Sequence, residues 1–146
     1  MTWRLLVIAN ETVATPDVQW LVESRAGDEG ADVLVVAPAL SGRIAYWASD
    51  DTRSRRAAEA RLRRSLEVLH TAGIDAEGAV GDADPLLALA DALALFPADE
   101  VVIATHPPGR SSWLERNVVS RARARFRTPI HHLVVEGDRH THFAAA

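Results

Sequence analysis

Residues 84–105 read DPLLALADALALFPADEVVIAT, a helical pattern followed directly by a short apolar run. Asp84 suits a helix cap and Pro85 the first helical position, because proline there lacks only an N–H that has no helical partner anyway. The helical pattern stops before Pro97. The run at 100–105 is apolar and β-branched, as expected of a strand buried on both faces. This stretch therefore predicts one helix and strand unit of a parallel sheet.

The same alternation continues along the whole chain. Strand and helix in strict alternation imply a parallel sheet with right-handed crossovers and helices on both of its faces. Thr15 and Pro16 form a second cap and first-turn pair. Runs of strand length lie at 3–9, 32–38, 75–80, 100–105 and 130–136. Helices are expected over about 16–26, 52–72 and 85–96.

The longest expected helix, over about 52–72, has two different faces. Arg55, Glu59 and Arg63 have the spacing of i,i+4 ion pairs. Gly73 follows as a natural C-cap. The apolar stripe of this helix consists of Ala58, Leu62, Leu66 and Leu69.

Length and composition indicate one globular domain. We expect it to occupy residues 1–136 of the 146, with a disordered tail at 137–146. Hydrophobic residues make up 48% of the chain, yet no apolar run approaches the about 18 residues needed to cross a bilayer. The run after Met1 is too short for a secretory signal and lacks its cleavage pattern. We therefore expect a soluble, cytoplasmic protein with no membrane partner.

Cysteine content and charge exclude several function classes. The absence of cysteine rules out disulfides, thiolate zinc sites and thiol catalysis. The formal net charge of −4 argues against nucleic acid as a partner. All sixteen basic residues are arginine, and many of them gather in the clusters RSRRAAEARLRR (53–64) and RARARFR (121–127).

The expected ligand site lies at the carboxyl ends of the strands. In open parallel sheets, ligands bind beyond these ends where the strand order reverses. This places the loops NETVAT (10–15) and HPPGRSS (106–112) at the site. The candidate ligand-binding residues are Ala9, Asn10, Glu11, Ala37, His106, Gly109, Arg110, Ser111 and Ser112.

These two loops, together with GDADP (81–85) and ADEVVIAT (98–105), resemble the universal stress protein family. The resemblance runs from about Arg4 to Glu136 and rests on the order and spacing of the motifs. It implies a five-stranded α/β sheet in the order 3-2-1-4-5, with helices on both faces. It also implies a homodimer through the fifth strand and, in many members, ATP or AMP binding.

The chain departs from the family's ATP motif, G-x2-G-x9-G-[ST]. In this register the motif positions hold His106, Gly109, Val119 and Ser120, so two of the three glycines are missing. Glycine matters there because it lets backbone amides approach phosphate without a side chain in the way. The carboxylate that ends the family's first strand corresponds to Asn10, which has no charge. We therefore expect no required cofactor and no ATP in the family's usual pose, which leaves ATP or AMP as a candidate ligand.

A second reading of the loop after the fourth strand is physically better. Ser112 and Glu115 form a capping box, which predicts a helix beginning at Trp113 with Ser120 inside it. The loop residues before that helix offer free amides, two hydroxyls and a guanidinium to a phosphate or carboxylate. The alternative is that Ser112 only caps its helix and Arg110 is solvated. The expected apolar face of this helix consists of Leu114, Val118, Ala122 and Phe126.

Aromatic and histidine residues give further candidates. Tyr46 and Trp47 follow the second strand, where they would form a lid over the site or pack on a neighbouring helix. His131 and His132 are consecutive in a strand and face opposite sides, so they cannot chelate one metal together. One is expected to pack and the other to form a hydrogen bond. No metal site is predicted.

The function that these observations favour is a non-enzymatic, universal-stress-protein-like domain. It would bind a small anionic or nucleotide-like ligand at the carboxyl ends of the first and fourth strands. One alternative is a protein-interaction module that uses its arginine-rich helices, with no ligand. Another is a small hydrolase or transferase around His106, although no serine or carboxylate in the sequence is tied to that histidine.

Overall fold

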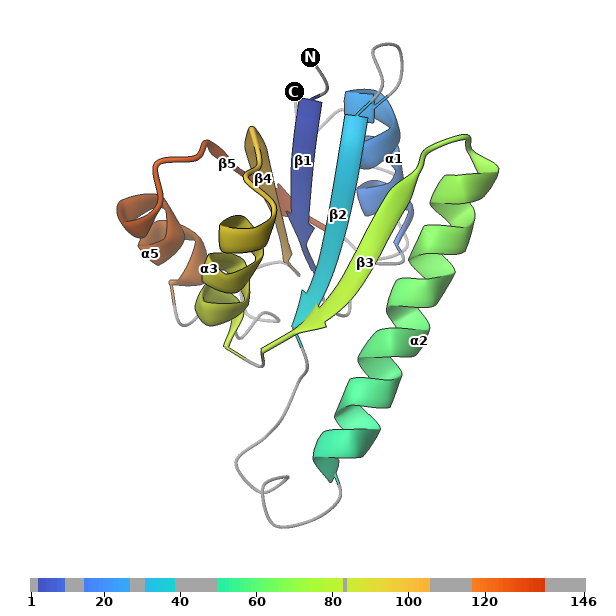
Figure 1. Cartoon of the computed structure of the whole chain (residues 1–146), viewed down its shortest axis with the longest axis horizontal. Helices are drawn as coiled ribbons and strands as arrows, with labels where there is room; N and C mark the ends of the chain where they lie inside the picture. The colour runs from blue at the N-terminus through green and yellow to red at the C-terminus, as the bar shows by residue number, and fades with distance from the viewer. Residues whose placement is uncertain are drawn as a thin grey trace.

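A computed structural model of the chain shows one five-stranded parallel sheet in the order β3-β2-β1-β4-β5 (Figure 1). The described residues are 3–9, 15–26, 31–38, 50–82, 84–105 and 117–135. The strands are β1 (Trp3–Ile8), β2 (Ala31–Pro38), β3 (Ala76–Gly81), β4 (Glu100–Thr105) and β5 (Ile130–Val134). The helices are α1 (Pro16–Ala26), α2 (Asp50–Thr71), α3 (Pro85–Leu95) and α5 (Val118–Arg125). The predicted fold class and strand order are thus confirmed.

The central strand β1 organises the core. It pairs in parallel with β2 on one side and with β4 on the other, so that Leu5 lies opposite both Val33 and Glu100. Successive side chains of a strand point to opposite faces of the sheet. Because all residues of β1 from Leu5 to Ile8 are buried, both faces must be covered.

Two helical layers provide this cover (Figure 1). Leu5 and Val7 belong to the apolar cluster that includes α1 and α2, whereas Leu6 and Ile8 belong to the cluster that includes α3 and α5. The continuous apolar pattern of the strand therefore corresponds to burial on both faces, as predicted. Each large apolar side chain buried in this way contributes about 1.5–3 kcal/mol.

Local signals in the sequence set the helix ends. The Asp84 side chain accepts a hydrogen bond from the Leu86 amide at 3.0 Å and caps α3, as predicted. Gly73 follows α2 with a φ of +86°, and the Ile74 amide donates to the Leu69 carbonyl at 2.9 Å. This is a Schellman ending, for which glycine is favoured because it adopts the left-handed conformation without steric cost.

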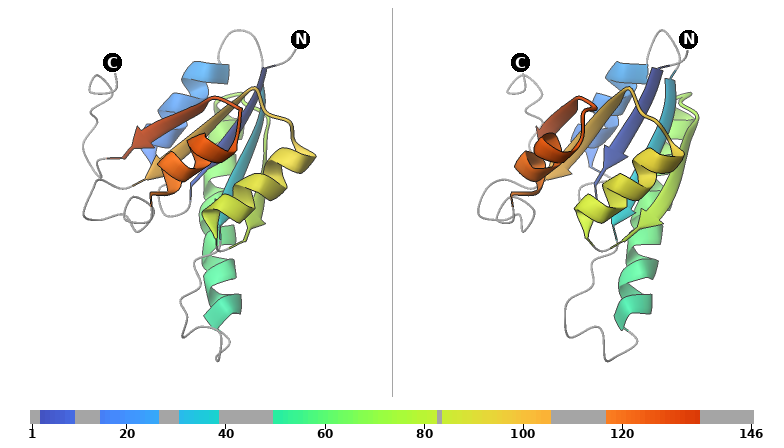
Figure 2. Two further views of the ribbon diagram at one scale, coloured as in Figure 1. Left: turned by 90° about the vertical axis from the view of Figure 1, so that its left-hand side faces the viewer. Right: turned by 60° about the vertical axis from the view of Figure 1, so that its left-hand side comes forward.

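The helix α2 combines the two predicted faces. Ala58, Leu62 and Leu69 are buried, and Leu66 is partly buried against the same cluster. On the exposed side, Arg55 and Glu59 approach to 3.9 Å. The first turns of α2 continue beyond the carboxyl end of β3 (Figures 1 and 2).

We predict that Gly81→Ala lowers the free energy of unfolding by about 1–3 kcal/mol, as expected for overpacking. A Cβ at Gly81 would lie 2.9 Å from the Ala88 Cβ on α3 and 3.0 Å from Val36 Cγ1 on β2. The Ala88 Cβ cannot rotate away, so the sheet and α3 must separate. Urea denaturation of the wild type and the variant measures the effect.

Gly73→Asn is the matched control, since no atom lies within 4 Å of a Cβ at that position. Asparagine also tolerates the left-handed conformation. A loss for Gly73→Asn as large as that for Gly81→Ala would contradict the packing explanation.

Candidate functional site

The candidate site lies at the carboxyl edge of the sheet, between β1 and β4. From β1, the chain adds β2 and then β3 on one side of this central strand. It then returns and adds β4 and β5 on the other side of β1. This is the reversal of strand order at which ligands bind in such folds. The helix α5 follows β4 and runs antiparallel to it, so its N-terminus is at this edge.

The structure places few of the predicted ligand-binding residues. Ala9 and Ala37 end β1 and β2 side by side at this edge, and both are fully buried. Their side chains are therefore packed, and any contact with a ligand would come from their backbone. Tyr46 and Trp47 lie outside the described residues. The other predicted site residues also lie outside them: Asn10, Glu11, His106, Gly109, Arg110, Ser111 and Ser112.

The beginning of α5 corrects one prediction. Asn117 precedes the helix with φ 55° and ψ 38°, a left-handed conformation. A single helix from Trp113 through Phe126 is therefore wrong, because a left-handed residue interrupts a right-handed helix. The parts of that prediction that fall on described residues are confirmed, since Ser120 is helical and Val118 and Ala122 are buried on the apolar face. Ser112, Trp113, Leu114 and Glu115 lie outside the described residues.

Backbone N–H groups converge at this helix N-terminus. The first helical hydrogen bond runs from the Arg121 amide to the Asn117 carbonyl at 2.9 Å, so the amides of Val118, Val119 and Ser120 have no helical acceptor. A left-handed residue followed by a right-handed one turns successive N–H groups toward a common concave side, which suits an anion. The positive end of the helix dipole acts in the same direction.

Val119 does not obstruct this surface. In the family's motif register it replaces a phosphate-binding glycine, and the sequence suggested that its side chain would hold the backbone away from a ligand. The structure instead buries it at 6% exposure in the cluster with α3 and β4. The position that needs glycine-like freedom is Asn117, because asparagine is the residue after glycine that most readily adopts a positive φ.

A polar pair lies nearby, at the end of β4. Thr105, 2% exposed, forms a 2.8 Å hydrogen bond between its Oγ1 and Nε2 of His132 on β5. This confirms that one of the two consecutive histidines is hydrogen-bonded. The sequence did not identify Thr105 as its partner, because the pairing depends on the β4–β5 register. Burial of the imidazole, then the positive charge of Arg123 and the neighbouring His131, lower the pKa of His132 below its ordinary value of 6.5.

The described residues contain neither a metal centre nor a membrane-spanning helix. No group of three histidine or carboxylate side chains among them is placed to hold a metal ion. No described helix is both long enough and apolar enough to cross a bilayer.

The lowered pKa of His132 predicts a specific pH dependence of stability. The unfolded chain takes up a proton at His132 at higher pH than the folded chain, so stability falls as the pH drops through 6.5 and levels below the folded pKa. Urea denaturation between about pH 5 and pH 8 measures this. His132→Gln should flatten the slope, and His131→Gln, which keeps the Thr105 bond, should not. An unchanged slope in His132→Gln would refute the assignment.

The conformation of Asn117 gives a second prediction. Asn117→Val should lower the free energy of unfolding by about 1–2 kcal/mol, because a β-branched residue is strained at positive φ. Asn117→Gly should stay within about 0.5 kcal/mol of the wild type, since glycine relieves the strain but loses more backbone entropy on folding. Thermal and urea denaturation test both variants. Equal stability of the valine and glycine variants would show that the left-handed turn is not formed.

Comparison with known proteins identifies the fold. No protein family model and no curated protein sequence matches this chain. A universal stress protein from Archaeoglobus fulgidus superposes with a TM-score of 0.63 at 16% identity, covering 90% of this chain and 98% of its own. A structure of the universal stress protein from Archaeoglobus fulgidus in complex with dAMP superposes with a TM-score of 0.61 at 15% identity, covering 90% of this chain and 97% of its own.

Two further structures superpose over nearly their whole lengths. A universal stress protein in complex with cAMP has a TM-score of 0.60 at 19% identity, covering 92% of this chain and 97% of its own. A universal stress protein family member from Arabidopsis thaliana, with AMP bound, has a TM-score of 0.58 at 16% identity, covering 93% of this chain and 94% of its own. These likenesses confirm the resemblance predicted from the sequence at the level of the fold. The chain has the universal stress protein fold.

Proposed function

We propose that this protein binds an adenine nucleotide, with AMP or cAMP preferred to ATP, at the carboxyl edge of β1 and β4. It does so without catalysis, as a soluble, cytoplasmic stress-response protein. The observation that carries the proposal is the N-terminus of α5. There the left-handed Asn117 leaves three successive amides without helical acceptors, on the edge where this fold binds ligands.

The ligands of similar proteins support this choice. Structures of the same fold contain AMP, dAMP and cAMP, which share an adenine base and one phosphate. One phosphate matches the capacity of a single helix N-terminus, which offers a few N–H groups and half a positive charge. The longer phosphate chain of ATP needs further donors, and two of the three glycines that bring backbone amides to it in the family are absent.

The absence of catalysis is part of the same proposal. Thr105, at the end of β4, and His132 are hydrogen-bonded to each other. Thr105 is almost fully buried and therefore poorly placed to act as a nucleophile on a bound ligand. Binding alone accounts for the arrangement.

A homodimer through β5 belongs to the proposal as well. β5 is an edge strand, paired only with β4 among the described strands. Ile130, His131 and Val134 on it are only partly buried. An exposed edge presents unpaired N–H and C=O groups, which pairing with a second copy would satisfy.

Ser120→Glu tests the ligand site directly. Ser120 is exposed in the first turn of α5, where a carboxylate stabilises a helix by about 0.3–1 kcal/mol. The same carboxylate would repel a phosphate held by the neighbouring amides. We expect the variant to be at least as stable as the wild type and to bind AMP at least about tenfold more weakly by calorimetry, equivalent to about 1.4 kcal/mol.

Ser120→Gln is the matched control, because it has the same size without the charge and should retain most of the affinity. Titrations with cAMP and ATP establish the ligand preference, and mass spectrometry of the purified protein identifies any nucleotide that co-purifies. Two results would refute the proposal: equal AMP affinity in Ser120→Glu and wild type, or no binding of any nucleotide by the wild type.

A further inference from the structure

The outer face of α3 is apolar. Leu87, Ala90, Asp91, Ala94 and Leu95 follow each other at helical spacing on the side of α3 away from the sheet. Leu87 is 42% exposed and Leu95 is 88% exposed. Most exposed helix faces are polar, so this one suits contact with another surface. The two alanines permit a close approach, and Asp91 provides the single charge.

The neighbouring helix α5 has the opposite charge. It packs beside α3 on the same face of the sheet (Figure 2). Residues 82–100, which include α3, contain five carboxylates and no basic residue. The described residues 117–135, which include α5, contain four arginines and no carboxylate. Within the helices themselves, α3 carries one carboxylate, Asp91, and α5 carries three arginines, so this face has a largely apolar helix next to a basic one.

Two of the exposed arginines of α5 lie on the side of the helix away from Arg123. Arg123 donates from Nη2 to the Ile130 carbonyl at 3.1 Å, so its side of the helix faces β5. At about 100° per residue, Arg121 and Arg125 lie roughly half a turn away from Arg123. Arg125 covers the Phe126 ring, with its guanidinium carbon 5.4 Å from the ring centre.

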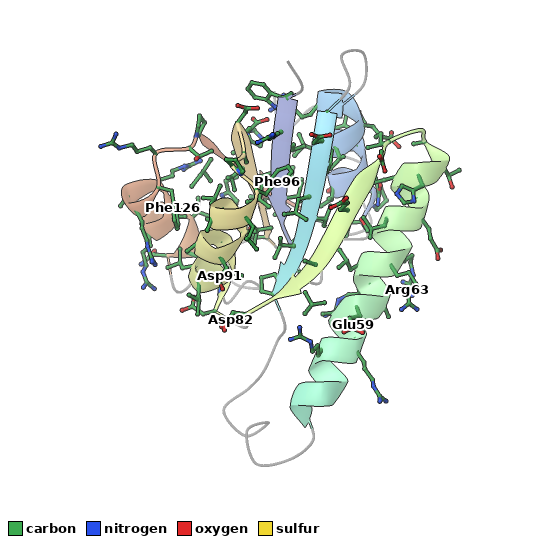
Figure 3. All side chains as sticks on the ribbon, viewed as in Figure 1. Glu59, Arg63, Asp82, Asp91, Phe96 and Phe126 are labelled. Atoms are coloured by element: carbon green, nitrogen blue, oxygen red, sulfur yellow. The ribbon has the colours of Figure 1, made fainter. Side chains whose placement is uncertain are left out.

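These charges are not neutralised by the described part of the chain. No ion pair within it involves Asp91, Arg121 or Arg125. Figure 3 shows Asp91 on α3 and Phe126 on the neighbouring α5. Asp91 is thus exposed within the apolar stripe of α3, and Arg121 and Arg125 are exposed on the neighbouring α5.

We propose that the face formed by α3 and α5 is a self-complementary interface for a second copy of this chain. Both helices run antiparallel to their strands and are therefore parallel to each other. A two-fold axis that runs along the helices, between the two copies, places α3 of one copy on α5 of the other in parallel, and the reverse contact forms by symmetry. Asp91 then meets Arg121 and Arg125 of the second copy, while Leu87 and Leu95 are buried.

Charge-swap variants test this interface. Variant A carries Asp91→Arg, and variant B carries Arg121→Glu with Arg125→Glu. Each should weaken self-association at least about tenfold in sedimentation velocity, because like charges then face each other. An equal mixture of A and B should associate again, because both symmetric contacts become complementary in the heterodimer.

A control with the same charge change lies on the other face of the sheet. Arg56→Glu with Arg63→Glu alters exposed residues of α2 and should leave self-association unchanged. Melting temperatures of all variants establish that they are folded. If β5 also pairs, the wild type is a tetramer and A and B are dimers; otherwise the wild type is a dimer and A and B are monomers. In both cases the mixture doubles the mass of the separate variants.

Three results would overturn the proposal. The first is a wild type that stays monomeric up to about 1 mM protein. The second is self-association that A and B do not weaken. The third is a mixture of A and B that sediments no faster than the separate variants, because complementarity between α3 and α5 would then not hold the copies together.

Discussion

The burial of β1 on both faces is the constraint on which the rest of the structure depends. A parallel strand with no polar side chain from Leu5 to Ile8 is stable only if helices cover the sheet on each side. Right-handed crossovers meet this need by placing α1 and α2 on one face and α3 and α5 on the other. Close contacts such as that of Gly81 with Ala88 follow from this packing.

The same constraint creates the candidate site. Because every crossover helix after a strand begins at the carboxyl edge, the N-terminal amides of α5 lie where the strand order reverses. Packing also decides the role of Val119: its side chain belongs to the core. Asn117 has the conformation that glycine would otherwise supply. A loop with few glycines is thus compatible with a phosphate-binding helix N-terminus.

The arginines on the two faces of the sheet have different surroundings. Four arginines of α2 are exposed beside a helix stripe that is buried, which is typical of a solvated surface: Arg55, Arg56, Arg63 and Arg64. Those of α5 lie next to α3, whose outer stripe is apolar and carries one carboxylate, Asp91. A docking role for both arginine clusters at once would require two separate surfaces. The two arginine clusters therefore have different surroundings in the structure, although they look alike in the sequence.

The sequence by itself determined the elements and their order. Asp84 and Gly73 mark helix ends through local hydrogen bonds and backbone preferences, which need no distant partner. The apolar runs predicted the strands to within two residues, and their alternation with helices determined the fold class. The position of the candidate site at the carboxyl edge followed from this topology.

Only the tertiary structure decided how individual residues at that edge are used. The capping box at Ser112 and Glu115 predicted one continuous helix, but Asn117 interrupts it. The bond between Thr105 and His132 joins residues 27 positions apart, and it depends on the register of β4 with β5. Helix caps and turns are local and can be read along the chain. Side-chain partners across a sheet, and the burial of a single valine, depend on contacts that exist only once the layers have packed.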